Sequence, residues 1–292
     1  MRGMVLGLLL VLCSSRAFAQ QSVMLDELTA SEIIDAVAAG KTTLILYTGG
    51  HHENMYSSTV NAVNGPTRDA VVISKHNIIG QYLARRVAEE LGNALALGVI
   101  PYTPNGRVMG QSGNEYTGEL GENPGHMRFP GTISITDETY RRLLDDIASS
   151  AIMSSHFKNV VILGDNGGGQ DVMKNAAEGL NTKWEPKGVG VYFFPVYAEA
   201  KLECAKTISQ LALPPELPRG SGPGGGCIIP LDDAAEVLAL DPDGKFVRIH
   251  KLTVPPVGAR LVTPELGRIL LEQKVKLAVG HILAEVPEVP RI

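Results

Sequence analysis

The stretch from Lys158 to Gln170, KNVVILGDNGGGQ, constrains the fold of this chain most strongly. Its apolar run Val160–Leu163 is typical of a strand buried on both faces of a sheet. The run ends at Gly164-Asp165-Asn166, and three glycines then lead into Gln170–Leu180, which we predict to be helical. Polar side chains between a buried strand and the following helix lie at the carboxyl edge of a parallel sheet, where open α/β folds bind ligands. We therefore expect the functional site at this edge.

Strand patterns alternate with helix patterns along the rest of the chain. The further predicted strands are Thr42–Tyr47, Ala94–Ile100, Gly131–Ile135 and Gly188–Val196. The further predicted helices follow Thr29, span Asn77–Leu91, follow Thr136, span Ala234–Leu238 and span Pro264–Ala284. This alternation predicts the α/β class, with a single doubly wound, mostly parallel sheet and helices on both faces.

The first nineteen residues have the pattern of a secretory signal. Arg2 supplies positive charge, Val5–Leu12 is an apolar segment too short to span a bilayer, and Ala17-Phe18-Ala19 resembles a cleavage site before Gln20. We predict a signal peptide at residues 1–19, a single domain at residues 20–292, and an exported mature protein that is periplasmic or secreted.

Charge and cysteine content narrow the choice of partners. The formal net charge is -5 and no basic run is longer than Arg85-Arg86 or Arg141-Arg142, so we expect no nucleic-acid partner and no membrane association after signal cleavage. Cys204 and Cys227 can form a disulfide in an oxidising compartment, or stay as one buried and one loop thiol. Two cysteines are too few for a zinc-thiolate site.

Several segments together resemble the creatininase (creatinine amidohydrolase) family. Gly125–Thr132, GHMRFPGT, is similar to the family segment H-x-x-F-P-G-T, and Val160–Gln170 is similar to its strand followed by N-G-H-G-G-N. Weaker similarity occurs at Thr48-Gly49-Gly50, Lys75-His76-Asn77 and Ala235–Leu238. The resemblance runs from about Thr42 to Leu277 and implies an α/β/α sandwich that is often assembled as a hexamer.

The resemblance implies metal-dependent hydrolysis of a small cyclic or linear amide. One or two divalent ions (Zn, Mn or Fe) would bind a water molecule, lower its pKa and polarise the amide carbonyl. Such a site requires several Asp, Glu and His side chains that converge from different strand ends. The metal can also have been lost, because the family's ligand motifs are altered in this chain.

The implied metal ligands are His52, His76, Asp165 and Asp233. His52 stands at the position of an acidic ligand, His76 matches a ligand that is Asp or His in the family, and Asp233 matches a late acidic residue. Asp165 precedes the glycine-rich turn and can substitute for a missing ligand. Each has a simpler interpretation: a solvated turn for His52, packing before a helix for His76, turn hydrogen bonds for Asp165 and a helix N-cap for Asp233.

The resemblance also assigns catalytic and substrate-binding residues. Glu53 and His126 are the catalytic candidates, and a loop histidine with satisfied hydrogen bonds is the alternative for His126. Asn166 takes the place of the histidine in N-G-H-G-G-N, and with Gly167 and Gly168 it is predicted to bind substrate.

Three functions therefore stay open. The first is an exported amidohydrolase of the creatininase type, and the second is a creatininase-fold protein that has lost catalysis and binds a small molecule or a partner. The histidine of the family's late motif is replaced by Ile228, which favours the second function. The third is a phosphate-ligand binder that uses the glycine turn, although Lys-Ser/Thr of a P-loop is missing there.

Overall fold

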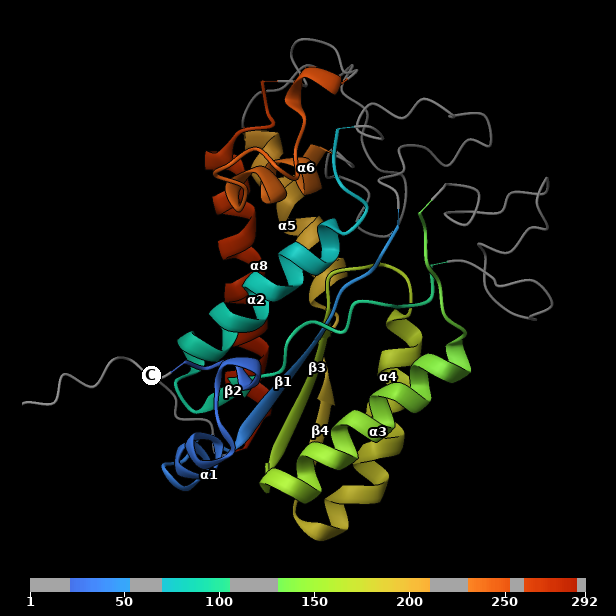
Figure 1. The fold of residues 1–292 in the computed structure, drawn as a ribbon, viewed down its shortest axis with the longest axis vertical. Helices are drawn as coiled ribbons and strands as arrows, with labels where there is room; N and C mark the ends of the chain where they lie inside the picture. The colour runs from blue at the N-terminus through green and yellow to red at the C-terminus, as the bar shows by residue number, and fades with distance from the viewer. Residues whose placement is uncertain (1–21, 53–69, 106–130, 211–230, 253–259, 288–292) are drawn as a thin grey trace, which may run out of the picture.

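The computed structural model describes residues 22–52, 70–105, 131–210, 231–252 and 260–287. Within them the chain forms a parallel sheet with helices on both faces (Figure 1). The strands are β1 (Thr43–Thr48), β2 (Ala94–Ala96), β3 (Asn159–Gly164) and β4 (Gly190–Phe193). The α-helices are α1 (Ala30–Ala38), α2 (Lys75–Leu91), α3 (Asp137–Ser155), α4 (Gln170–Trp184), α5 (Val196–Gln210), α6 (Leu231–Ala239) and α8 (Pro264–Glu285). Short 3₁₀ turns occur at Leu25–Glu27, Glu185–Lys187 and Ile249–Lys251.

The strand order is β2-β1-β3-β4, and every described pair is parallel. The central strands β1 and β3 pair along their full length, from Thr43 opposite Asn159 to Thr48 opposite Gly164. Every residue of both strands is buried. The chain leaves β1 towards β2 on one side and β3 towards β4 on the other, so the sheet is doubly wound, as predicted.

Two hydrophobic cores lie on opposite faces of the sheet. Leu44 and Leu46 of β1 point into a core shared with α1, α3 and α4. Ile45 and Tyr47 point into a second core, shared with α2, α5, α6 and α8. Figure 1 shows α3 and α4 on one side of the strands and α2 and α8 on the other. The alternation of adjacent β1 residues between the cores follows from the two-residue repeat of a strand.

Local sequence sets where several helices begin. The Thr29 side chain accepts a hydrogen bond from the Glu32 amide and the Glu32 side chain accepts one from the Thr29 amide, which forms a capping box at α1. At α3 the Thr136 side chain accepts a hydrogen bond from the Thr139 amide. Thr263 caps α8, whose first residue is Pro264. Proline suits this position because the first helical amide has no partner within the helix.

The structure corrects four sequence-based predictions. Residues 131–135 do not form a strand, since Ile133 makes only an isolated antiparallel bridge to His51. The strand predicted to reach Ile100 ends at Ala96 and continues only as a bridge between Thr48 and Ile100. Helix α2 begins at Lys75, so His76 lies in its first turn rather than before it.

The fourth correction concerns Asp233, which is the third residue of α6 and therefore does not cap that helix. Helix α5 is an addition that the sequence did not predict.

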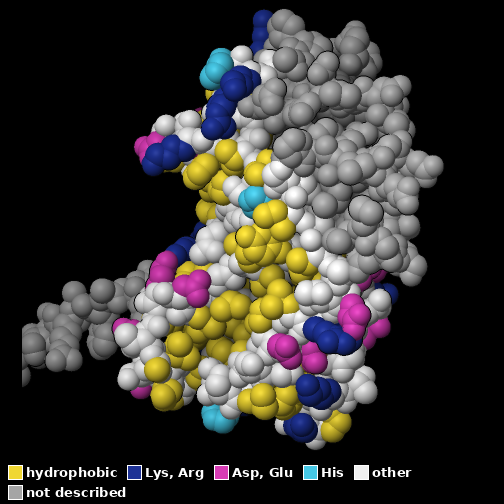
Figure 2. Space-filling model, turned by 45° about the vertical axis from the view of Figure 1, so that its right-hand side comes forward, with side chains coloured by type: hydrophobic (Ala, Val, Ile, Leu, Met, Phe, Trp, Pro, Cys, Tyr) yellow, Lys and Arg dark blue, Asp and Glu magenta, His cyan; other side chains and the backbone are white. Residues whose placement is uncertain are grey.

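The exported character of the chain is not tested by its fold. The predicted signal peptide, residues 1–19, and Cys227 lie outside the described residues. Cys204 is disulfide-bonded, and its pairing with Cys227 stays a prediction. Among the described helices, none combines the length and apolar character that a membrane span requires. Figure 2 shows hydrophobic side chains gathered in a band across one face of the described molecule, with charged side chains at its margins.

Candidate functional site

The site lies where β1 and β3 end, between the two halves of the doubly wound sheet. At this point the connections from β1 and β3 run in opposite directions, and open α/β folds commonly bind ligands at such a position. Asp165 directly follows β3, and its amide donates a hydrogen bond to the Thr48 carbonyl at the end of β1. Backbone pairing therefore places Asp165 at the predicted edge.

His76 lies between two carboxylates at this edge. Its Nδ1 is 3.2 Å from Oδ2 of Asp165, and its Nε2 is 4.0 Å from Oδ2 of Asp233. The three side chains are at most 6% exposed. The structure thus brings together three of the predicted site residues, which come from α2, the end of β3 and α6.

Two lysines occupy the same buried region. Lys274 of α8 places its Nζ 2.6 Å from Oδ1 of Asp165 and 2.6 Å from Oε2 of Glu236. Lys201 of α5 places its Nζ 2.6 Å from Oδ2 of Asp232 and 3.1 Å from Oδ1 of its neighbour in α6, Asp233. Each ammonium group therefore bridges two carboxylates.

These side chains form one connected group, which we call the buried charge cluster. Its members are Lys75, His76, Asp165, Lys201, Asp232, Asp233, Glu236 and Lys274. All eight residues are at most 5% exposed. Charged groups are rarely buried to this extent unless they are paired, and the cluster pairs them across α2, β3, α5, α6 and α8.

The surroundings shift the pKa values of the central pair. Burial and the nearby ammonium of Lys75 lower the pKa of His76, against the opposing effect of Asp165 and Asp233. Burial acts to raise the pKa of Asp165, but the ammonium of Lys274 and the contact with His76 outweigh it, and the pKa is lowered. His76 is therefore held as the neutral imidazole beside an ionised carboxylate.

The three carboxyl groups of α6 differ in pKa. Burial raises the pKa of Glu236 to about 8 and raises that of Asp232. Burial acts in the same direction on Asp233, but Lys201 and His76 outweigh it and the pKa is lowered. Environments that give neighbouring carboxyl groups different pKa values are common at functional sites.

The other predicted site residues are only partly described. His52 is buried, and the centroid of its ring is 4.8 Å from that of His76. Its carbonyl accepts a hydrogen bond from the Lys75 ammonium. Glu53 and His126 lie outside the described residues, so their catalytic roles stay predictions.

The glycine turn after β3 is held by its own contacts. The Asn166 side chain donates to Oγ1 of Thr103 at 2.9 Å and accepts from the Gly168 amide at 3.1 Å. A Cβ at Gly168 would lie 1.9 Å from the carbonyl oxygen of Pro104, so only glycine fits this close approach. Asn166 and Gly168 thus stabilise the turn, and substrate binding by Asn166, Gly167 and Gly168 stays a prediction.

The described donors do not fit a pair of divalent cations. A metal ion between two carboxylates would lie about 2.0–2.2 Å from their oxygens, in the space that the Lys201 and Lys274 nitrogens fill. His76 Nε2 and Asp233 Oδ2 face each other at 4.0 Å, and the His52 ring lies 4.8 Å from the His76 ring. Across the described ranges, no group of three or more His, Cys, Asp or Glu side chains is arranged to hold a metal ion.

Sequence reasoning missed Lys201, Asp232, Glu236 and Lys274. A signal was present for Lys274, which lies four residues from Leu270 and from Ala278 on the buried face of α8. Glu236 likewise interrupts the apolar run Ala234–Leu238. A charge inside an apolar helical stripe indicates a buried partner of opposite charge, although a lysine that reaches solvent is the more frequent case.

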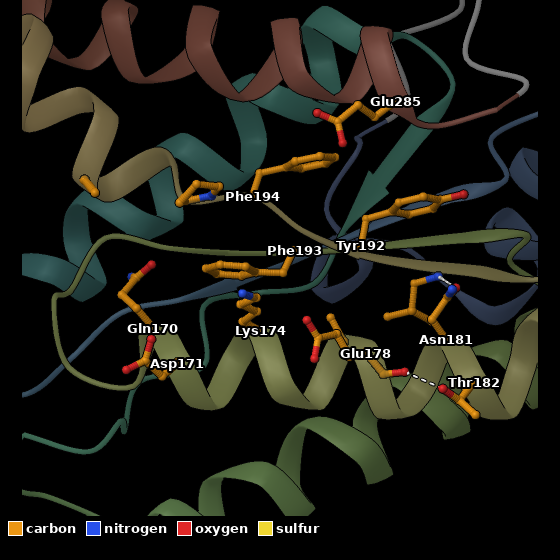
Figure 3. A pocket seen from close by; sticks show the side chains of 14 residues that line it. Gln170, Asp171, Lys174, Glu178, Asn181, Thr182, Tyr192, Phe193, Phe194 and Glu285 are labelled. Carbon is orange, nitrogen blue, oxygen red and sulfur yellow. Dashed lines mark hydrogen bonds between the residues drawn. The ribbon is translucent and has the colours of Figure 1, made fainter.

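A separate cavity of about 720 Å³ lies beside the edge strand β4 (Figure 3). Its walls are α4, the aromatic side chains Tyr192, Phe193 and Phe194, and the end of α8 at Glu285. Gln170 and Asp171 at the start of α4 line its other end. No member of the buried charge cluster lines this cavity.

Comparison with known proteins agrees with the resemblance seen in the sequence. A family model described as creatininase, creatinine amidohydrolase, matches residues 70–212. A mutant creatininase of the Zn-Zn type is 20% identical, with 91% of this chain and 99% of that chain covered and a TM-score of 0.63. A structure described as creatininase Mn is 21% identical, with 91% and 100% covered and a TM-score of 0.63.

A third similar structure is a mutant creatininase complexed with creatine. It is 20% identical, with 91% of this chain and 100% of that chain covered and a TM-score of 0.61. Among curated proteins, none matches the sequence. The family match spans the segments that supply His76, Asp165 and Lys201, and the fold matches creatininase structures over nine-tenths of the chain. The family match over residues 70–212 and the fold together support placing this chain in the creatininase family.

Proposed function

We propose that the protein is an exported amidohydrolase of the creatininase type that cleaves the C–N bond of a small cyclic or linear amide. The family match and the fold support a metal-dependent amidohydrolase. A creatininase structure complexed with creatine supports a small-molecule substrate. A homo-oligomer is proposed from the family resemblance alone, and size-exclusion chromatography with light scattering would test it.

The observation that carries the proposal is the position of His76 between Asp165 and Asp233 at the carboxyl edge of the sheet. With a proton on Nδ1, His76 donates a hydrogen bond to the Asp165 carboxylate, which fixes the ring and leaves the lone pair of Nε2 on the side of Asp233. The 4.0 Å between Nε2 and Asp233 Oδ2 is too long for a direct hydrogen bond. A polar group that lies to one side of the line joining these two atoms could be within hydrogen-bond distance of both, and from there it could transfer a proton to Nε2.

Asp165 has a positioning role in this proposal. It accepts from His76 with one oxygen and from Lys274 with the other, so its orientation is fixed from two sides. A carboxylate that holds a histidine in one tautomer is a recurring arrangement in hydrolases. In this proposal His76 accepts the proton and Asp165 orients the His76 ring.

Export is supported by the signal-like segment at residues 1–19 and by the disulfide of Cys204, because disulfides persist in oxidising compartments.

The test is hydrolysis of a panel of lactams, cyclic ureides and linear amides by purified protein, measured by product release with and without added Zn²⁺ or Mn²⁺. We expect His76→Gln to lower kcat/KM about 100-fold or more, which is the scale of a lost general base. His250→Gln, at an exposed residue away from the cluster, is the matched control and should leave kcat/KM unchanged. Hydrolysis that persists in His76→Gln, or its absence for the whole panel, would refute the proposal.

A second function, ligand binding without catalysis, is favoured by the pairing of Asp165, Asp232, Asp233 and Glu236 with lysines. Carboxylates engaged in this way are less available to a reacting group. Calorimetry with the same panel separates the two functions, since a pure binding protein would give saturable heats and intact ligands after incubation.

A further inference from the structure

We propose that the ammonium groups of Lys201 and Lys274 take the place of divalent cations in this protein, so that the buried charge cluster is complete without a metal ion. The inference rests on the family match and on the geometry of the cluster. It does not depend on whether the protein hydrolyses amides.

The two lysines make the connections that a bridging cation makes. Lys274 joins the end of β3 to α6 by contacting Asp165 and Glu236 from α8. Lys201 joins α5 to α6 by contacting Asp232 and Asp233, which lie in the first turn of that helix. Carboxylates from separate elements, which would repel one another, are thereby held together.

An ammonium group and a metal ion cannot both occupy the space between these carboxylates. An ion bound to the same oxygens would require distances of about 2.0–2.2 Å, which would bring it into overlap with a nitrogen at 2.6 Å from them. A lysine could leave only by moving its charge elsewhere in a buried region, since Lys201 and Lys274 are about 5% exposed or less. Metal binding would therefore require both displacement and burial of an unpaired ammonium, which is strongly unfavourable.

The charge balance leads to the same conclusion. The cluster holds four carboxyl groups and the ammonium groups of Lys75, Lys201 and Lys274, and Lys201 and Lys274 contact all four carboxyl groups directly. The cluster carries a formal charge of -1 when every carboxyl group is ionised, and two divalent ions would make it +3 with the lysines in place. Buried groups are stable when their charges are compensated, so the lysines leave little negative charge for a metal ion to neutralise.

The first measurement uses the wild-type chain. The protein would be produced in medium supplemented with Zn²⁺ and Mn²⁺, dialysed, and examined by elemental analysis and by thermal unfolding with and without EDTA. We expect less than about 0.1 equivalent of metal and a Tm that EDTA does not change, because only a ligand bound to the native state stabilises it. About one equivalent or more of bound metal, or a Tm lowered by EDTA, would overturn the inference.

The second measurement asks whether removing an ammonium group creates a metal site. In Lys274→Ala the carboxylates of Asp165 and Glu236 lose their cation, and we expect Zn²⁺ or Mn²⁺ to bind at least about tenfold more tightly than to wild type, seen as a metal-dependent rise in Tm. Lys276→Ala, at an exposed lysine of the same helix, is the matched control and should gain nothing. Equal metal affinity in Lys274→Ala and wild type would count against the inference.

Lys201→Ala repeats this test at the second position if Lys274→Ala does not fold. The results are distinguishable from those for the proposed function. Hydrolysis by metal-free wild-type protein supports both proposals. Hydrolysis only after metal is added overturns the inference that the cluster is complete without a metal ion, and it leaves the amidohydrolase proposal in place. A metal-free protein that hydrolyses nothing refutes the amidohydrolase alone.

Discussion

Lys274→Met offers the sharpest test of how the buried charge cluster stabilises the fold. Methionine keeps most of the length and the apolar stem of lysine, so the variant removes the ammonium group with little change in packing. The group that is lost lies 2.6 Å from Asp165 and from Glu236, and both partners are nearly inaccessible to solvent. Asp165 has a lowered pKa and stays ionised beside the neutral His76, so it is the charge left without compensation, whereas Glu236, whose pKa is about 8, is mostly protonated at pH 7.

The expected magnitude follows from the carboxylate that stays behind. Breaking a buried ion pair by removing one partner costs about 3–5 kcal/mol, because the other charge is left buried without compensation. For a chain of this size that loss lowers Tm by about 10 °C. Replacing both partners is less unfavourable than replacing one, so Lys274→Met combined with Asp165→Asn should recover roughly half of the lost stability or more.

The assay is reversible urea unfolding at pH 7 followed by circular dichroism, with the disulfide intact in every variant. Lys276→Met is the control for a lysine-to-methionine change on the same helix, and it should alter the free energy of unfolding by less than about 0.5 kcal/mol. A loss below about 1 kcal/mol for Lys274→Met would refute the reasoning, since a solvated pair contributes only that much. A double variant no more stable than Lys274→Met would refute it as well.

Three further predictions concern other parts of the molecule. Burial raises the pKa of Glu236 to about 8, so the folded state keeps a proton that the unfolded chain has lost, and stability should fall by about 1 kcal/mol or more from pH 6.5 to 8. His76 has a lowered pKa, so it makes stability rise with pH, but mainly below about pH 7, where the unfolded chain still binds a proton on this residue. In Glu236→Gln the decline should flatten, and an unchanged slope in urea unfolding would disprove the assignment. A Cβ at Gly267 would lie 2.0 Å from the Ala235 carbonyl oxygen, so Gly267→Ala should separate α8 from α6 and cost about 1–3 kcal/mol, whereas no loss of stability in urea would show that the helices can yield. Mass spectrometry of the exported protein should find Gln20 at its N-terminus, and an intact Met1 would exclude the predicted cleavage.

The sequence predicted those parts of the fold in which one physical requirement dominates. The apolar runs of β1 and β3 allow only a strand buried on both faces, and the structure places them at the centre of the sheet. Residues 131–135 have the composition of a strand, but Ile133 pairs only with His51, and a strand requires a partner along its length. Helix α5 was not predicted because Lys201 interrupts its apolar face, although the structure buries that lysine.

The site was half predictable for a related reason. His76 and Asp165 follow from the rule that ligands bind where parallel strands end, and backbone pairing brings those residues there. Lys201 and Lys274 do not follow from that rule, because a lysine in a helix normally extends its charge to solvent. Only the tertiary structure shows that α5 and α8 direct both ammonium groups inward, onto carboxylates that lie 31 and 109 positions away in sequence.

The two halves of the cluster are therefore necessary to each other. Asp232, Asp233 and Glu236 on one short helix would repel one another in a buried site without a cation, and an ammonium group in that place would be equally unfavourable without the carboxylates. A change from a site neutralised by metal ions to one neutralised by lysines would pass through an uncompensated charge at each substitution. It avoids this only if each new lysine displaces a metal ion. The carboxylates at this edge of the sheet thus require cations beside them. Lys201 and Lys274 supply that positive charge from covalently attached side chains, which a chelator cannot remove.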